Sequence, residues 1–170
     1  MKSVLLVGVV VVCCAWQAQP DGRSGDVGAV AGVLEDLHDA ASKADGERYF
    51  DLFAPEAVFF GTDATERWPL EEFRRYASQR FEAGSGWTYH ASRRHISFSQ
   101  DRRTAWFDEV LVNAKYGECR GTGVLVKRRG GWKIAQYNLS IPIPNEIALE
   151  VVEMIKSSTR RATEGHGERK

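Results

Sequence analysis

The clearest pattern in the sequence is a period-two alternation of apolar and polar residues over positions 120–140. Two β-rich runs flank Gly130-Gly131, which predicts a hairpin with a type I′ turn, because glycine readily adopts positive φ. Arg120 and Thr122 share one face of the first strand and lie at the polar end of the second. An apolar floor with a polar mouth is typical of a ligand pocket. The matching face of the second strand carries Trp132, Ile134, Gln136, Asn138 and Ser140.

Helical periodicity dominates the first half of the chain, and strand-like alternation dominates the second half. Pro55 closes the second predicted helix, Pro69 suits the first turn of the third, and Asn145 is a good N-cap for a C-terminal helix. Helices that precede a meander predict an α+β fold, with the helices packed on one face of a curved antiparallel sheet. The predicted helices are 26–45, 46–54, 70–83 and 145–160, and the predicted strands are 57–60, 87–99, 104–114, 119–127 and 132–141.

The first fifteen residues have the pattern of an export signal. Lys2 precedes an apolar run at 4–12, and small residues follow at Cys13-Cys14-Ala15. The run is too short to span a bilayer, so we expect cleavage and a periplasmic or secreted protein. A lipoprotein is the alternative: the lipid would be on Cys13 or Cys14, and only in that case do we expect a membrane as partner.

The rest of the chain divides into a spacer, one domain, a helix and a tail. Residues 16–25 are polar and glycine-rich, which predicts a flexible spacer. We expect one folded domain over 26–144, since 170 residues with 43% hydrophobic content suffice for a single core. The helix of 145–160 follows, and residues 161–170 are predicted to be a disordered tail.

Charge and cysteine content exclude several classes of function. The 23 basic and 23 acidic residues balance to a formal charge of zero, so nothing points to nucleic acid as a partner. Beyond the export signal only Cys119 remains, which excludes an internal disulfide and predicts a buried, inert thiol. The sequence contains neither a zinc-type cluster nor a phosphate-binding glycine loop, so we predict no metal and no cofactor.

Several motifs carry a family resemblance. A run from Asp51 to Asp63 contains Phe-Ala-Pro-Glu-Ala-Val, Glu66 follows it, and the last strand opens with Gly131-Trp-Lys-Ile134. Together with the order of elements, they resemble the SnoaL-like branch of the nuclear transport factor 2-like superfamily. The resemblance covers 27–144 and implies a cone, in which a strongly bent sheet wraps around three helices and leaves a blind pocket. It also implies frequent dimerisation, here as a homodimer, but it implies no single chemistry.

In enzymatic relatives a carboxylate inside the cone acts as general base, so the resemblance makes the nearby acids candidates. Asp63 and Glu66 follow the first predicted strand, where the implied pocket rim lies. In the strand 104–114, alternation puts Asp108 and Glu109 on opposite faces, and both faces are apolar. We take Asp108, Glu66 and Asp63 as the catalytic candidates.

Arg120 is expected to pair with Asp108 across neighbouring strands, either as a structural salt bridge or to orient a ligand. Such a pair would lower the pKa of Asp108 and weaken it as a base. Gln136 and Asn138 stand where many similar domains have histidines, and amides bind a ligand without moving its proton. His38 lies beside the apolar stripe of the first helix, where a structural hydrogen bond and a catalytic role both remain open.

Three functions follow from these observations. The leading hypothesis is a pocket for a small apolar or carbonyl-containing molecule. The second is a lyase or isomerase with a carboxylate base, and the third is an interaction module that dimerises through the outer sheet face and the C-terminal helix. For the first hypothesis the expected walls and polar contacts are Trp68, Trp106, Trp132, Arg120, Thr122, Gln136, Asn138, Asp108 and Glu66.

Overall fold

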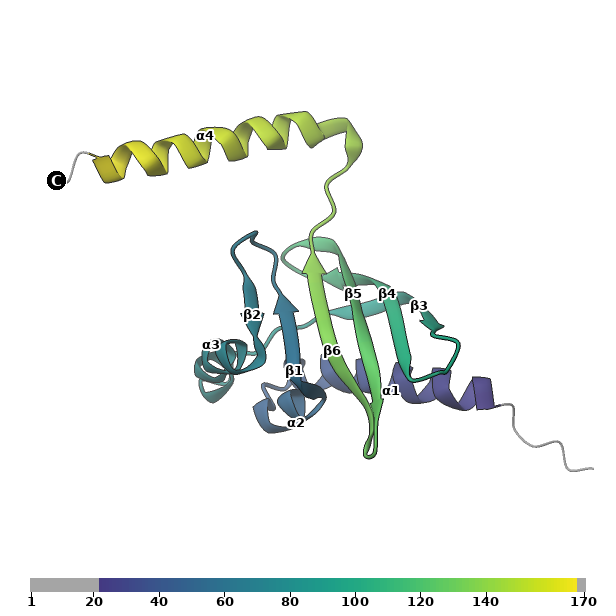
Figure 1. Cartoon of the computed structure of the whole chain (residues 1–170). Helices are drawn as coiled ribbons and strands as arrows, with labels where there is room; N and C mark the ends of the chain where they lie inside the picture. Colours follow the sequence, from purple (N-terminus) through teal and green to yellow (C-terminus); the bar gives the residue numbers. More distant parts are fainter. Residues whose placement is uncertain (1–21, 168–170) are drawn as a thin grey trace, which may run out of the picture.

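The computed structural model describes residues 22–167, which form a curved six-stranded sheet, three helices packed against it and a projecting C-terminal helix (Figure 1). The predicted export signal, Cys13, Cys14 and the spacer up to residue 21 lie outside the described residues, so the export signal and the spacer stay predictions from the sequence.

The sheet has the strand order β2-β1-β6-β5-β4-β3. Neighbouring strands are antiparallel except for β1 and β6, which run parallel. The predicted α+β class and the long antiparallel meander are therefore confirmed. The elements are α1 (Gly22–Ser42), α2 (Gly46–Asp51), β1 (Phe53–Phe60), β2 (Arg67–Pro69), α3 (Leu70–Glu82), β3 (His90–Phe98), β4 (Thr104–Asn113), β5 (Gly117–Arg128), β6 (Gly131–Ser140), a 3-10 turn (Asn145–Ile147) and α4 (Ala148–Gly167).

The first helix starts earlier than the sequence pattern suggests. α1 begins at Gly22, inside the predicted spacer, and not at Asp26. Asp26 thus lies within the helix, and its carboxylate accepts hydrogen bonds from Arg102 Nε at 3.0 Å and from Lys127 Nζ at 2.8 Å. These partners lie far away in sequence, so periodicity could not reveal them.

The first strand also differs from its prediction. β1 starts at Phe53 and not at residue 57, because Phe53 pairs with Ile134 of β6. The register then shifts before Val58, and Pro55 falls in this irregular segment, where its missing N–H costs no ladder bond. The second predicted helix therefore ends at Asp51 rather than at residue 54.

The hairpin between β5 and β6 is confirmed, but its predicted turn type is wrong. Arg128 pairs with Gly131, so Arg129 and Gly130 are the two central residues. A type I′ turn needs positive φ at both central positions. Here Gly131 has a φ of +114°, and neither central residue has a positive value.

A β-bulge at Ala135 inverts the faces of the last strand. Val124 and Leu125 are adjacent in β5, yet they pair with Gln136 and Ile134, so Ala135 has no partner of its own. Such an extra residue moves every side chain after it to the opposite face.

The bulge explains why one prediction about β6 is wrong. Trp132 and Ile134 are buried, but Gln136 is exposed and Tyr137 is buried. The single face expected to run from Trp132 to Asn138 therefore does not exist. Tyr137, which alternation had placed on the other face, points into the cone.

The core lies between the three N-terminal helices and the concave face of the sheet, and aromatic rings fill much of it. Phe59 of β1 stacks on Phe73 of α3 with ring centroids 3.9 Å apart. Cys119 is buried as expected, and burial raises the pKa of its thiol. The buried rings of this core are Tyr49, Phe50, Phe53, Phe59, Phe73, Phe81, Phe107, Trp132 and Tyr137.

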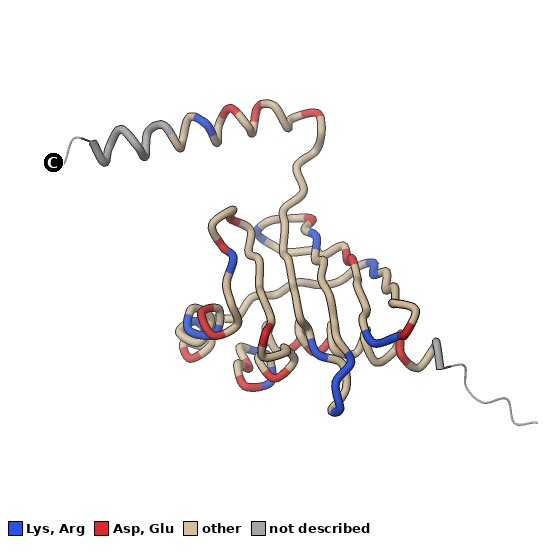
Figure 2. The backbone as a smooth tube through the Cα atoms, viewed as in Figure 1, with Lys and Arg blue, Asp and Glu red and all other residues tan. Residues whose placement is uncertain are grey.

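Acidic and basic residues are interspersed over the surface, and basic residues gather at the tip of the β5–β6 hairpin (Figure 2). Two of these basic side chains have acidic partners: Lys127 pairs with Asp26, and Arg128 pairs with Glu56. This tip is therefore largely neutralised within the chain.

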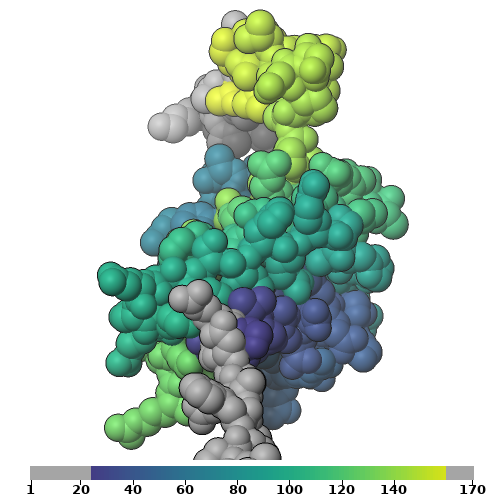
Figure 3. Space-filling model, turned by 90° about the vertical axis from the view of Figure 1, so that its right-hand side faces the viewer, coloured from purple at the N-terminus to yellow at the C-terminus, as the bar shows by residue number. Residues whose placement is uncertain are grey.

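The helix α4 stands away from the cone on an extended connection (Figures 1 and 3). It continues to Gly167, beyond the predicted end at residue 160, so the tail expected from 161 onward is largely helical. Several of its apolar side chains are exposed, led by Leu149 at 83%. None of the helices within 22–167 combines the length and apolar character needed to cross a membrane.

Candidate functional site

One carboxylate, that of Glu109 on β4, is buried inside the cone, with 1% of the residue exposed. Its Oε1 accepts a hydrogen bond from Tyr137 Oη at 3.0 Å and lies 2.8 Å from His38 Nε2. Its Oε2 accepts a hydrogen bond from Arg94 Nε at 2.8 Å, and Arg94 Nη2 adds an ion-pair contact at 2.8 Å. These four residues come from α1, β3, β4 and β6, so only the folded sheet brings them together.

The partners of Glu109 decide its charge. Burial alone would raise the pKa of this carboxyl, but the hydrogen bonds and charges of His38 and Arg94 outweigh burial and lower the pKa. Burial, followed by the charge of Glu109, raises the pKa of Tyr137 well above its ordinary value. At neutral pH the site therefore holds an ionised carboxylate and a neutral phenol. Because both carboxylate oxygens are occupied by donors, Glu109 is a weak general base.

His38 is the group in this network that can move a proton. A carboxylate only accepts hydrogen bonds, so Nε2 of His38 carries the proton toward Glu109. In the neutral ring, Nδ1 then has a free lone pair. A proton taken up at Nδ1 would create an imidazolium, which the Glu109 carboxylate stabilises. This is the carboxylate–imidazole arrangement of acid–base catalysis.

Two adjoining hollows lie inside the cone. The inner one, bordered by His38 and Tyr137, has a volume of about 20 Å³, which is room for about one water molecule. The outer one forms the mouth of the cone and has a volume of about 250 Å³. The residues that line both are Phe59, Trp87, Tyr89 and Leu139.

Aromatic side chains form most of the mouth. Trp68 stacks on Tyr76 with ring centroids 4.9 Å apart and on Phe73 at 5.7 Å, in nearly parallel planes. Glu66 and Arg80 supply the charged groups of this pocket. The mouth is therefore shaped for a flat, largely apolar molecule with a polar substituent.

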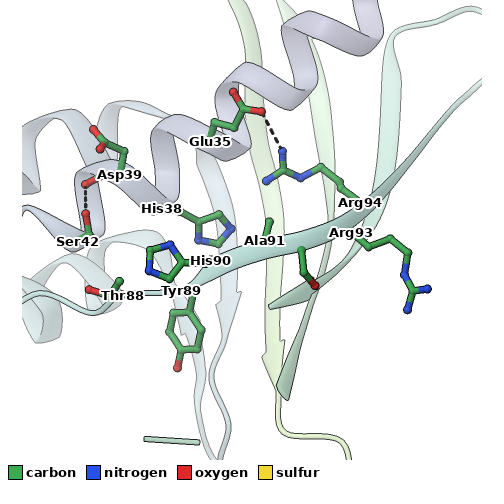
Figure 4. A pocket seen from close by; sticks show the side chains of 11 residues that line it. Glu35, His38, Asp39, Ser42, Thr88, Tyr89, His90, Ala91, Arg93 and Arg94 are labelled. Carbon is green, nitrogen blue, oxygen red and sulfur yellow. Dashed lines mark hydrogen bonds and ion pairs between the residues drawn. The ribbon is translucent and has the colours of Figure 1, made fainter. Parts of the chain in front are cut away.

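A further hollow of about 410 Å³ lies outside the cone, between α1 and the start of β3 (Figure 4). Most of its lining residues have polar side chains, among them Glu35, His38 and Asp39 from α1 and His90 from β3. Across the described residues, no group of three or more His, Cys, Asp or Glu side chains is arranged to hold a metal ion. His38 borders both this groove and the inner cavity.

Asp108, the first catalytic candidate, lies on the outer face of the sheet. Its side chain is 57% exposed and contacts His95 Nδ1 at 3.0 Å. In register it faces Thr122, whereas Arg120 faces Val110, so the predicted pair of Asp108 with Arg120 does not form. Alternation separated the two acids of this strand correctly, but both faces are apolar, so the sequence did not reveal which face is the inner one.

Several predicted pocket residues share that outer face and do not meet a cone ligand. Trp106 is 49% exposed there, and Arg120 and Thr122 lie on the same side of the neighbouring strand. Gln136 joins them because of the bulge in β6. The expectation that these side chains contact a ligand inside the cone is therefore wrong.

The predicted tryptophans occupy three different places. Trp68 lines the mouth, as expected of a pocket wall. Trp132 is buried at the start of β6, next to Phe98, with ring centroids 5.7 Å apart. The mouth adjoins Leu139 near the other end of that strand, so Trp132 belongs to the core rather than to the pocket.

The loop acids lie at the rim. Glu66 lines the mouth, and its Oε2 accepts a hydrogen bond from the backbone N–H of Asp63 at 3.1 Å. Asp63 is exposed, and its hydrogen bonds from the hydroxyl and the N–H of Thr65 lower its pKa. Asp63 and Asn138 line a neighbouring shallow hollow of about 380 Å³. Of the three acids proposed as bases, Glu66 is the one that lines the mouth.

Sequence reasoning considered Glu109 as one of the two acids of its strand but did not choose it, and it missed Arg94 and Tyr137 as site residues. A usable signal was present, since Glu109 and Arg94 are the charged side chains on the inward faces of strands that face each other in register. An unpaired buried charge is costly, so an inward acid predicts an inward base on the neighbouring strand.

Comparison with known proteins agrees with this geometry. Residues 30–144 match the family model described as the SnoaL-like domain. The chain belongs to the SnoaL-like domain family. The cone of this SnoaL-like domain is the fold of a solved structure described as NTF2-like, in line with the fold that the resemblance implied. No functionally curated protein matches the chain.

Solved structures share the fold at low identity. A provisionally assigned aromatic ring hydroxylase from Novosphingobium aromaticivorans has a TM-score of 0.61 and 17% identity, covering 71% of this chain and 92% of its own. A provisionally assigned dehydratase of the NTF2-like family from Streptomyces avermitilis has a TM-score of 0.60 and 15% identity, covering 72% and 99%. A cystatin-like domain of unknown function from Nostoc punctiforme has a TM-score of 0.62 and 16% identity, covering 85% and 96%. Similarity at this level shows the fold alone.

Proposed function

We propose that this SnoaL-like domain binds a small, flat, largely apolar molecule in the mouth of its cone. The observation that carries the proposal is the hollow of about 250 Å³ walled by stacked rings, among them Trp68, Phe73 and Tyr76. Each aromatic contact adds about 0.5–1.5 kcal/mol beyond the burial of its area. Glu66 and Arg80 would orient a carbonyl or hydroxyl group of the ligand.

Two further features belong to this proposal. The pattern of residues 1–15 supports export to the periplasm or the medium. The exposed apolar side chains of α4 support a homodimer, because monomers rarely leave such a row uncovered. A ring-binding pocket is also in line with the ring hydroxylase among the structural neighbours.

A comparison of two tryptophan variants tests the pocket. Calorimetric titration with 2-naphthol measures the affinity of the wild type, of Trp68→Leu and of Trp106→Leu. We expect Trp68→Leu to weaken binding by about tenfold, which corresponds to about 1.4 kcal/mol. Trp106 lies on the outer face, so Trp106→Leu is the matched control and keeps the wild-type affinity. Equal losses in both variants, or no binding by the wild type, would contradict the proposal.

Acid–base catalysis is a second candidate, favoured by the contact of 2.8 Å between His38 and Glu109. His38 would remove a proton next to a carbonyl group, and the Glu109 carboxylate would stabilise the imidazolium that forms. This replaces the carboxylate base expected from the sequence by an imidazole base held by a carboxylate.

Deuterium exchange tests this second candidate. The α-protons of cyclohexanone are followed by NMR in D₂O with the wild type, His38→Gln and His95→Gln. We expect catalysed exchange that His38→Gln abolishes and that His95→Gln, on the outer face, preserves. Exchange at the uncatalysed rate with the wild type would exclude this reaction for cyclohexanone and count against the candidate.

A further inference from the structure

His38 separates two hollows of very different capacity. The inner cavity of about 20 Å³ holds about one water molecule, whereas the groove between α1 and β3, at about 410 Å³, falls within the range of small-molecule sites. A molecule in the aromatic mouth is therefore kept away from His38, while a molecule in the groove lies directly against it. The side chain of His38 is 13% exposed, so its ring is partly open to solvent.

The groove also differs in chemistry from the mouth. Aromatic rings are prominent in the mouth, whereas hydroxyls, imidazoles, carboxylates and the guanidinium groups of Arg93 and Arg94 line the groove. In Figure 4, His38 reaches down from α1 to the same space as His90, and Ala91 points up toward the helix. Asp39 is already engaged by Lys43 Nζ at 2.8 Å, and Glu35 lies 3.7 Å from Arg94. The acids of the groove are thus largely neutralised, so the imidazoles are its groups best suited to accept a proton from a ligand.

We propose that this groove is a second ligand site, and that His38 meets its ligand there rather than through the mouth of the cone. The polar lining fits a small molecule that carries a hydroxyl or a carbonyl group. The chemistry assigned to this ligand rests on the acid–base candidate above, whereas the route to His38 is an independent geometric claim.

In the groove, one proton moves between the ligand and the imidazole of His38. Nδ1 of neutral His38 takes the proton of a hydroxyl or of a carbon next to a carbonyl, and the ligand keeps the electron pair of the broken bond. The imidazolium that results keeps its Nε2–H on Glu109, whose negative charge stabilises it. Return of the proton from Nδ1 to the ligand restores the neutral ring.

Modification by diethyl pyrocarbonate tests the route. The reagent acylates neutral imidazole nitrogens, and peptide mass spectrometry gives a separate rate for each histidine. His95, whose side chain is 65% exposed on the outer face, serves as the internal reference. In the wild type we expect His38 to react, and we expect saturating 2-naphthol in the mouth to leave that rate unchanged.

A groove-filling substitution supplies the decisive comparison. Ala91→Trp places a large ring in the groove and should slow modification of His38 by about tenfold, with the rate at His95 unchanged. If Ala91→Trp loses the native circular dichroism spectrum, Ser42→Trp, which fills the groove from α1, replaces it in the same measurement.

Two results would overturn the inference. One is a His38 that stays unreactive in the wild type, because its ring would then be closed from the groove as well. The other is protection of His38 by 2-naphthol together with an unchanged rate in the groove-filled variants, which would assign the route to the mouth. Deuterium exchange tests acid–base catalysis by His38 separately from the chemical modification. Failure of the proposed reaction is therefore distinguishable from failure of the proposed route through the groove.

Discussion

Asp108 and Glu109 are neighbours in the sequence with opposite environments in the fold. The side chain of Asp108 is 57% exposed beside His95, whereas Glu109 is buried among His38, Arg94 and Tyr137. The free energy of each side chain therefore depends on the face of β4 that it occupies. A buried carboxylate that loses its charge deprives the guanidinium of Arg94 of its buried counter-charge, which costs far more than the loss of a surface contact.

Substitution of each acid in turn should show that the buried face of β4 contributes more to stability than the exposed face. We expect Glu109→Gln to lower the free energy of unfolding by about 3 kcal/mol, because Arg94 loses its buried counter-charge and keeps only the contact with the exposed Glu35. Asp108→Asn is the matched control, and we expect it to change stability by less than about 1 kcal/mol. Urea unfolding followed by tryptophan fluorescence measures both. Similar losses in the two variants would show that Glu109 is not the buried partner of Arg94.

The lowered pKa of Glu109 predicts a pH dependence. Its folded-state pKa lies below the ordinary value of 4.5, so its contribution to stability is fully present above that pH. The contribution is lost as the pH falls from about 4.5 through the folded-state pKa. The difference in unfolding free energy between wild type and Glu109→Gln should therefore narrow in acid. If this difference in unfolding free energy widened below pH 4.5, the pKa of Glu109 would not be lowered in the folded state.

At the level of elements, β5 and β6 position the buried network. The bulge at Ala135 turns Tyr137 inward, and Gly121 of β5 leaves room for the contact between Tyr137 and Glu109. A Cβ at Gly121 would lie 2.5 Å from Tyr137 Oη and 2.8 Å from Glu109 Oε1. The glycine is thus required for space and not for its backbone angle.

Adding one methyl group to β5 tests this role. We expect Gly121→Ala to destabilise the fold by about 1–3 kcal/mol, because the buried network must shift to admit the methyl group. At Gly130, in the hairpin turn, a Cβ meets nothing within 4 Å and φ is not positive, so Gly130→Ala should stay within about 0.5 kcal/mol of wild type. Thermal unfolding compares the two variants, and equal stability would rule out the crowding at Gly121.

At the scale of the whole molecule, the helix α4 exposes apolar side chains that the cone does not cover. The helix stands off the cone, and Leu149, Met154 and Ile155 are 83%, 64% and 58% exposed. The outer face of the sheet also shows apolar side chains, including Trp106 and Val112. Two such surfaces on one chain favour the burial of one against the other in a homodimer.

Introduction of charge on the apolar side of the helix tests the proposed dimer. We expect sedimentation equilibrium to show a dimer for the wild type and at least a tenfold weaker association for Leu149→Glu combined with Met154→Glu, since a charge at an apolar contact is costly. Lys156→Glu is the control on the same helix, where Lys156 pairs with Glu153 at the surface. A monomeric wild type would exclude this assembly.

The sequence by itself determined the family, the helices with five of the six strands, and the antiparallel meander, because periodicity and turn residues are local properties. It did not predict the three-residue strand β2, which is defined by its pairing with β1. It also separated Asp108 from Glu109. Only the tertiary structure decided which of them faces inward, since both faces of β4 are apolar and the choice depends on where the helices pack. The bulge at Ala135 was equally invisible: one unpaired residue moves Gln136 outward and Tyr137 inward, and that depends on pairing with β5 rather than on the pattern of β6 alone.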